Sequence, residues 1–160
     1  MISFALLLQE YMLLGSFGGV LVKARKEVEL SVRVGNKSAA LGGVLAAVAN
    51  HGVNVLAYCT YSDGDDLIVL LITDNALAAK EAIHAAGFSC KANSVILVGA
   101  SDEVGAAARI GMHLGVAGVE ILYSYASSSG GDQFVAVFKT TDDEYAIQAL
   151  EVCPQARAAA

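Results

Sequence analysis

Apolar and polar positions along the chain predict a regular succession of strands and helices. Residues 27–34, EVELSVRV, alternate strictly, with Val and Leu on one face and charged or Ser side chains on the other, which is typical of a half-buried strand. Apolar residues then recur at helical spacing from Leu41 to Val48, and Gly52 ends that helix. The pattern continues with a strand at 52–61, an Asp-Gly hairpin turn at 62–65, a strand at 67–73, a helix capped by Asp74 to about Ala86, and a strand at 88–92.

The same order recurs in the second half of the chain. One constant shift relates Gly52 to Gly118 and Asn54 to Glu120. An internal repeat of this length indicates two copies of one small βαββαβ domain. The second copy is expected to contain a strand at 95–99, a helical stripe through Ala107, Ile110 and Leu114, a strand at 118–126, a turn at 127–132, a strand at 134–140, and a helix at 142–150.

These patterns divide the chain into four segments. Residues 1–26 are an extra apolar N-terminal segment, 27–93 the first domain, 94–153 the second domain and 154–160 a tail. The second copy lacks a convincing last strand, because EVCPQARAAA contains a proline and an alanine run. The N-terminal segment could fill the vacant sheet edge, since uncovered edges are a liability.

Two strands are apolar at every position, LIVLLI at 67–72 and FVAVF at 134–138. Strands of this kind are covered on both faces. Helices can cover one face, and the other needs a second chain or the N-terminal segment, of which a second chain is the simpler cover. This pattern therefore predicts a homodimer.

Composition narrows the class of partner. The 160 residues are 56% hydrophobic, carry a formal net charge of −6, and scatter their ten basic residues. A nucleic-acid site needs clustered cations, so no nucleic-acid partner is expected. The odd cysteine set Cys59, Cys90 and Cys153 has no CxxC spacing, which predicts free thiols in a reducing cytoplasm and no zinc.

The apolar run at 2–22 has its positive charges after it, in the reverse of signal-peptide order. A membrane span would have to bury Gln9 and Glu10 at a cost. We therefore expect this run to pack on the domain or on another chain, with membrane attachment as the alternative.

Candidate catalytic chemistry is sparse in the sequence. His51, His84 and His113 have no Cys, Asp or Ser partner at catalytic spacing. The acidic cluster at 63–66 suits a hairpin turn better than a Ca²⁺ loop, which needs more widely spaced ligands and a distal Glu. No phosphate-binding glycine loop follows a strand. The sequence predicts no catalytic site, no metal and no cofactor.

The loop at 35–41, Gly-Asn-Lys-Ser-Ala-Ala-Leu, enters a predicted helix N-terminus. Free backbone N–H groups and the helix dipole favour an anion there, and small residues let a carboxylate approach. Simple helix capping by Asn36 or Ser38 is the alternative interpretation.

Two short stretches stand on either side of the first predicted helix. They read Asn36-Lys37-Ser38-Ala39-Ala40-Leu41 and Gly52-Val53-Asn54-Val55. They resemble the motif of the ACT domain family, which is similar to N-[KR]-P-G-x-L followed, after one helix, by G-[IV]-N-[IV], with Ser-Ala here in place of Pro-Gly. The second copy has Asp102-Glu103-Val104-Gly105-Ala106-Ala107 and Gly118-Val119-Glu120-Ile121, with acids where the asparagines would be. From about residue 27 to 150 the chain resembles small bacterial and archaeal proteins made of two tandem ACT domains.

The resemblance implies an α+β fold with two ferredoxin-like βαββαβ repeats side by side, giving one antiparallel sheet of about eight strands with helices on one face. It also implies a non-catalytic regulator that binds a free amino acid or similar small carboxylate where two domains meet. A regulated enzyme is then a possible partner.

The site residues implied by the resemblance come from both motif stretches. Asn36, Lys37, Ser38, Ala39, Ala40 and Leu41 would contact the ligand from one domain, and Asn54 and Val55 from the facing domain. Asp102, Gly105 and Glu120 are the weaker second-copy equivalents. The main alternative function is an interaction or oligomerisation module whose pockets have decayed, and a membrane-peripheral regulator is a further one.

Overall fold

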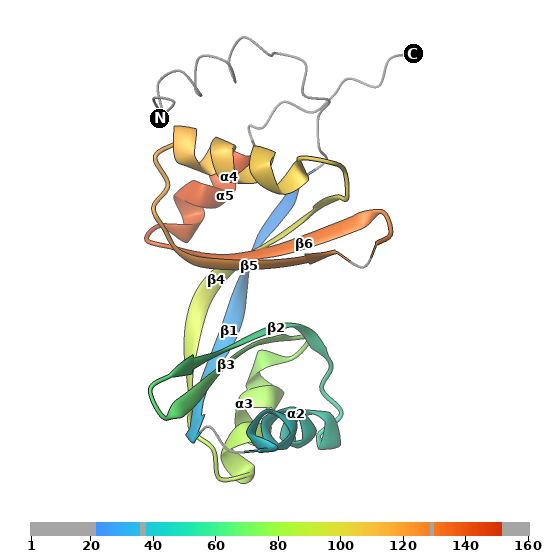
Figure 1. The fold of residues 1–160 in the computed structure, drawn as a ribbon, viewed down its shortest axis with the longest axis vertical. Helices are drawn as coiled ribbons and strands as arrows, with labels where there is room; N and C mark the ends of the chain where they lie inside the picture. The colour runs from blue at the N-terminus through green and yellow to red at the C-terminus, as the bar shows by residue number, and fades with distance from the viewer. Residues whose placement is uncertain (1–21, 36–37, 129, 152–160) are drawn as a thin grey trace. The chain divides into compact units, whose positions relative to one another are not determined.

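A computed structural model of the chain describes residues 22–35, 38–128 and 130–151. The fold divides into two compact units (Figure 1). One unit is Glu27–Val95, called unit A below. The other, called unit B, combines the described residues up to Lys26 with those from Ile96 onward.

Unit A is built on an antiparallel sheet centred on β3. Strands β1 and β2 both pair antiparallel with β3, and helices α2 and α3 pack on one face through a buried cluster of Leu, Val and Ile side chains. Its elements are β1 (Lys23–Gly35), α2 (Ala40–Asn50), β2 (Val55–Asp63), β3 (Asp66–Thr73), α3 (Ala76–Ala85) and the first part of β4 (Cys90–Ser101).

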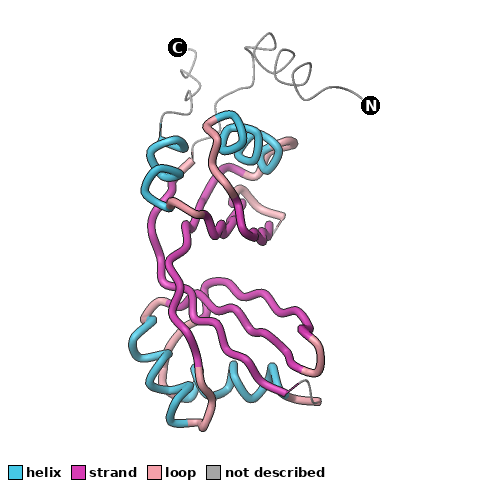
Figure 2. The backbone as a smooth tube through the Cα atoms, turned by 90° about the vertical axis from the view of Figure 1, so that its left-hand side faces the viewer, coloured by secondary structure: helices cyan, strands magenta, loops and turns pink. Residues whose placement is uncertain are grey.

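Unit B repeats this arrangement around β6, with β4 and β5 as antiparallel partners. Its further elements are α4 (Ala106–Val116), β5 (Ile121–Ser128), β6 (Gln133–Thr140) and α5 (Asp143–Glu151). Ile110, Leu114 and Leu150 of the helices are buried on Ile96 and Val98 of β4. Within each unit the helices lie on one side of the strands (Figure 2). The predicted α+β fold of two ferredoxin-like repeats is therefore confirmed.

The described part of the chain contains six strands, in the order β2-β3-β1-β4-β6-β5, fewer than the eight expected. The predicted strands at 88–92 and 95–99 form a single strand, β4, because no Gly or Pro interrupts the extended backbone between them. β1 likewise begins at Lys23, four residues earlier than the alternation suggests.

The start of β1 replaces the missing last strand of the second copy. β1 lies beside β4 in the strand order, and residues up to Lys26 belong to unit B. Val22 and Ala24 pack against the unit B core, and Lys26 Nζ forms an ion pair with Glu144 at 2.9 Å. That ion pair raises the pKa of Lys26. Residues 1–21, the bulk of the apolar run predicted to cover this edge, lie outside the described residues.

Two strand predictions need correction. Glu29 is expected on a solvated face of β1, yet it is fully buried opposite Ile72, while Val28 is 42% exposed. Alternation sets which side chains share a face, but not whether water reaches it. Both faces of β3 are buried as predicted, but within a single chain, because Ile68, Leu70 and Ile72 are each no more than 5% exposed. Burial of β3 therefore does not require a second chain.

Three of the helices end in the same local structure. At the C-termini of α2, α3 and α4 a glycine has a positive φ, and the next residue donates its N–H to the carbonyl five residues back. This is the Schellman motif, in which the residue after the glycine is usually apolar. Here those pairs are Gly52-Val53, Gly87-Phe88 and Gly118-Val119.

Two of the helices, α3 and α5, start at a side-chain cap. Asn75 caps α3 by accepting from the N–H of Ala78, and Asp142 caps α5 by accepting from the N–H of Tyr145. The sequence places the α3 cap at Asp74, one residue too early. No helix in the described part of the chain has the length and apolarity needed to cross a bilayer.

Candidate functional site

The loop between β1 and α2 ends on an unusual backbone conformation. Ala39, the N-cap of α2, has φ 73°, the one positive φ among the described non-glycine residues. An L-residue pays about 1 kcal/mol or more there, which is why the ACT motif has glycine at this position. In the second copy Gly105 has the same conformation, with φ 88°. Both copies therefore build the same turn into the helix, although only one has the residue that suits it.

The N-terminus of α2 has no acidic side chain in its first turn and no side-chain hydrogen bond at its cap, Ala39. The first N–H groups of a helix have no intrahelical partner, so those of Ala40, Leu41 and Gly42 are available to an acceptor. The N-cap is Ala39 and not Ser38, while Asn36 and Lys37 lie outside the described residues.

A cavity of about 330 Å³ opens beside this turn. Its walls come from the end of β1, the turn itself, and one distant aromatic side chain. The lining residues are Val34, Gly35, Ser38, Ala39, Ala40 and Phe88. The cavity brings together three of the predicted site residues, Ser38, Ala39 and Ala40, and Leu41 does not line it.

Phe88 was not anticipated from the sequence as a site residue. It directly follows Gly87 at the end of α3, and its N–H donates to the carbonyl of Ile83 at 3.0 Å. The Schellman motif thus directs the half-buried ring toward the core and the start of α2. The ring Cζ lies 3.6 Å from the place that a Cβ would take at Gly43. The signal in the sequence that could have identified Phe88 is a Gly followed by an aromatic residue at the end of a helix.

Asn54 and Val55 lie at the other end of α2. The backbone of Asn54 is held by Asp74, whose carboxylate accepts the Asn54 N–H at 3.0 Å and whose own N–H donates to the Asn54 carbonyl at 3.1 Å. The Asn54 side chain is exposed. Asp74 is therefore a positioning residue for Asn54, a role that the sequence does not reveal.

The two halves of the predicted site are separated within one copy. The 11 residues of α2 span about 16 Å, and the turn precedes the helix whereas Asn54 follows it. Unit A therefore does not bring Asn54 to the cavity. A ligand contacted by both would need another domain copy to supply one side.

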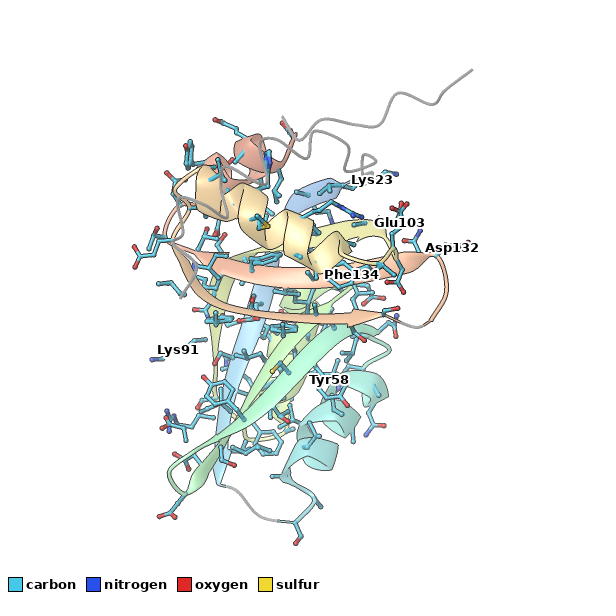
Figure 3. The ribbon with its side chains drawn as sticks, turned by 45° about the horizontal axis from the view of Figure 1, so that its top comes forward. Lys23, Tyr58, Lys91, Glu103, Asp132 and Phe134 are labelled. Carbon is cyan, nitrogen blue, oxygen red and sulfur yellow. The ribbon has the colours of Figure 1, made fainter. Side chains whose placement is uncertain are left out.

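In the second copy, the corresponding loop is hydrogen-bonded to the hairpin between β5 and β6 of the same unit. The Asp102 carboxylate accepts a hydrogen bond from the Ser128 hydroxyl, and the Asp102 N–H donates to the Asp132 carbonyl at 3.1 Å. Glu103 and Asp132 lie at the same end of unit B (Figure 3). Glu103 pairs with Arg109 at 3.3 Å. Asp102 is thus already bonded within the unit, and Gly105 keeps only the backbone conformation.

The hairpin of unit A is held differently. Arg33 donates to Asp66 at 2.8 Å and also to Asp63, which engages two of the three carboxylates of the cluster considered for Ca²⁺. Hydrogen bonds with Asp66 and then Asp63 raise the pKa of Arg33. Among the described residues, no group of three His, Cys, Asp or Glu side chains could hold a metal ion.

The ring nitrogens of the histidines contact backbone carbonyls or a thiol, since His84 Nε2 lies 3.8 Å from Cys90 Sγ. Nδ1 of His51 lies 2.9 Å from the Ala47 carbonyl, and Nε2 of His113 lies 2.9 Å from the Ala149 carbonyl. Cys59 and Cys90 are free thiols, and burial raises the pKa of Cys90. A raised pKa keeps the thiol protonated and weakens it as a nucleophile. Cys153 is outside the described residues.

Comparison with known proteins identifies the architecture. A family model described as an ACT domain pair matches residues 26–153. No curated protein sequence matches the chain.

Solved structures share the fold at low sequence identity. A protein of Bacteroides thetaiotaomicron superposes with a TM-score of 0.73 at 24% identity, covering 80% of this chain and 88% of that one. The regulatory subunit of aspartate kinase from Thermus thermophilus gives 0.60 at 16% identity, with coverage of 84% and 96%. The corresponding subunit from Thermus flavus gives 0.56 at 15% identity, with coverage of 83% and 97%.

Proposed function

Because the chain belongs to the ACT domain pair family, we propose that it is a non-catalytic regulatory protein that binds a free amino acid. The ligand carboxylate would accept hydrogen bonds from the first N–H groups of α2. The amide of Asn54 from a second copy of the chain would complete the site. An amide suits a zwitterion, since it offers a donor to the carboxylate and an acceptor to the ammonium group.

One observation supports this proposal above the others. Ala39 holds a left-handed conformation that costs an alanine free energy, and that conformation opens the α2 N-terminus toward a cavity of about 330 Å³. A volume of this size lies at the small end of the range for ligand sites. The turn keeps its conformation although Ala39 stands where the motif has glycine, which supports a role for the turn in binding.

We propose a homodimer in the cytoplasm, with another protein as the regulated partner. The separation of Asn54 from the cavity within one copy supports the dimer. The Thermus thermophilus structure is described as a regulatory subunit of an enzyme, which supports a separate regulated enzyme. Ligand binding to the dimer would then alter how the dimer acts on that enzyme.

A thermal-shift screen of the full chain against the proteinogenic amino acids tests the proposal. A ligand at one hundred times its Kd stabilises a protein by about 2.7 kcal/mol, and we expect at least one amino acid to raise the melting temperature by several degrees. Calorimetry should then give a stoichiometry of one ligand per chain. If no amino acid at millimolar concentration shifts the transition, the proposed function is wrong.

The second candidate is an interaction module whose pockets have decayed. The bonds of Asp102 to Ser128 and Asp132 favour it for the second copy, because they occupy the loop that would otherwise contact a ligand. This candidate predicts a stable dimer whose melting temperature is unchanged by every amino acid. The same screen therefore separates the two candidates.

A further inference from the structure

We infer that the cavity beside Phe88 selects ligands with an apolar side chain, and that Phe88 is the residue that determines this specificity. The inference rests on the proposed amino-acid binding and adds the chemical class of the ligand. The six residues that line the cavity are called the Phe88 pocket below.

The walls of the Phe88 pocket carry little polar chemistry. Val34, Ala39, Ala40 and Phe88 present only carbon atoms from their side chains, and Ser38 is the one polar side chain among the lining residues. None of the described residues that line it has a charged side chain. Against these walls, a charged or amide ligand side chain would lose water contacts without a matching partner, which is costly.

The backbone that carries the Phe88 ring is held in place without a ligand. Gly87 at φ 84° and the N–H of Phe88 on the Ile83 carbonyl anchor the backbone at both sides of the turn. The ring is half-buried and belongs to the unit A core, so its inner part is held by packing while its exposed part faces the pocket. A wall fixed in this way requires little ordering on binding, which favours affinity.

The polar and apolar parts of the ligand would therefore contact different parts of the site. The N–H groups at the start of α2 are chemically suited to the carboxylate common to all amino acids, whereas the Phe88 pocket contacts the variable side chain. The small side chains of Ala39 and Ala40 leave the space that the ligand would fill. We expect valine, leucine, isoleucine or methionine to bind more tightly than glycine, aspartate, asparagine or lysine.

The expected size of the preference follows from buried area. Each buried methylene changes affinity about fourfold. A ligand with three or four side-chain carbons in the pocket should therefore bind at least tenfold more tightly than glycine, even when burial is incomplete. Aspartate, which is similar in size to valine but charged, should lose that advantage.

Calorimetry on the full-length protein with leucine, valine, aspartate and glycine tests the inference, using wild type, Phe88→Leu and Phe88→Ala. Phe88→Ala should weaken leucine binding at least fivefold while leaving glycine binding within twofold, with Phe88→Leu intermediate. Ile83→Val is the matched control, because Ile83 lies in the same core but does not line the pocket. It should change neither affinity.

The outcomes separate this inference from the proposed function. If amino acids bind but aspartate binds as tightly as leucine, the specificity inference is wrong while the proposed function stands. The same holds if Phe88→Leu and Phe88→Ala weaken leucine and glycine equally, since the effect would then be on folding. If no amino acid binds the wild-type chain, the proposed function and the inference both fail.

Discussion

Ala39 and Gly105 are equivalent residues that meet one backbone requirement with different side chains. Both have a positive φ at the N-cap of a helix, and Ala39 is exposed, so its methyl group adds little packing. Replacing Ala39 with Gly removes the steric conflict of the left-handed conformation.

We therefore predict that Ala39→Gly raises the free energy of unfolding by about 1 kcal/mol and that Gly105→Ala lowers it by about the same amount. A Cβ at Gly105 would meet only the flexible end of Arg109 at 3.4 Å, so backbone strain is the main effect there. Urea denaturation of both variants measures the difference. A loss of stability in Ala39→Gly would show that the methyl group has a packing role.

Asn54 and Glu120 occupy equivalent places but offer different chemistry. The Asn54 amide can donate and accept, whereas an ionised Glu120 carboxylate only accepts and would repel a ligand carboxylate. Asn54 is exposed, so its side chain is available to a ligand without a folding penalty.

We predict that Asn54→Ala weakens amino-acid binding by about 1–3 kcal/mol, the usual cost of an unpaired polar group. Glu120→Ala should cost less, or tighten binding by removing repulsion. Calorimetry with the tightest ligand from the screen compares the two. Binding that survives Asn54→Ala and disappears in Glu120→Ala would place the site in the second copy.

At the scale of elements, β1 is one of two strands, with β4, that belong to both units of the fold. Its last nine residues, Glu27–Gly35, belong to unit A, and its start serves unit B, where Ala24 packs on the core beside β4. Unit B is therefore incomplete without residues that precede the first copy in the sequence.

We predict that Ala24→Asp lowers the stability of unit B by about 2–3 kcal/mol, because it places a charge against the apolar core. Lys23→Asp, its exposed neighbour in the same strand, should stay within about 0.5 kcal/mol of wild type. Amide hydrogen exchange should quicken across residues 96–151 in Ala24→Asp before it quickens in β3. Equal protection of β4 and β6 in both variants would refute the role of this strand start.

At the scale of the molecule, β2 and β5 are the two end strands of the described strand order. Leu56 on β2 is 45% exposed, and its second-copy equivalent, Leu122 on β5, is 54% exposed. Tyr58 also stands exposed on β2 (Figure 3). Exposed apolar residues on an unpaired edge favour pairing with another chain. β2 is the better candidate, because Asn54 lies directly before it.

We predict a dimer at micromolar concentration in sedimentation equilibrium, weakened at least tenfold by Leu56→Lys, since a charge would be placed in the interface. Leu122→Lys is the matched control and should leave the dimer intact. A wild-type monomer would contradict the dimer itself. Dissociation by Leu122→Lys alone would move the interface to β5.

Local patterns determined much of this protein. The alternation in residues 27–34, the helical stripe from Leu41 to Val48 and the repeat of both in the second half predict the tandem α+β architecture, and the family model confirms it. The glycines at turns and helix ends can also be predicted from the sequence, because a positive φ is a requirement on a single residue. The motif residues 36–41 and 52–55 indicate the ACT family without reference to any tertiary contact.

Tertiary structure decided what the patterns leave open. Glu29 is buried although its neighbours in sequence predict a solvated face, because alternation assigns a side chain to a face without saying what covers it. Phe88 lines the same cavity as Ala39 and Ala40 from nearly fifty residues away, and the start of β1 lies beside β4 at the edge where the second copy lacks a last strand of its own. These are long-range contacts, and their partners are set by packing in three dimensions rather than by the periodicity of either segment.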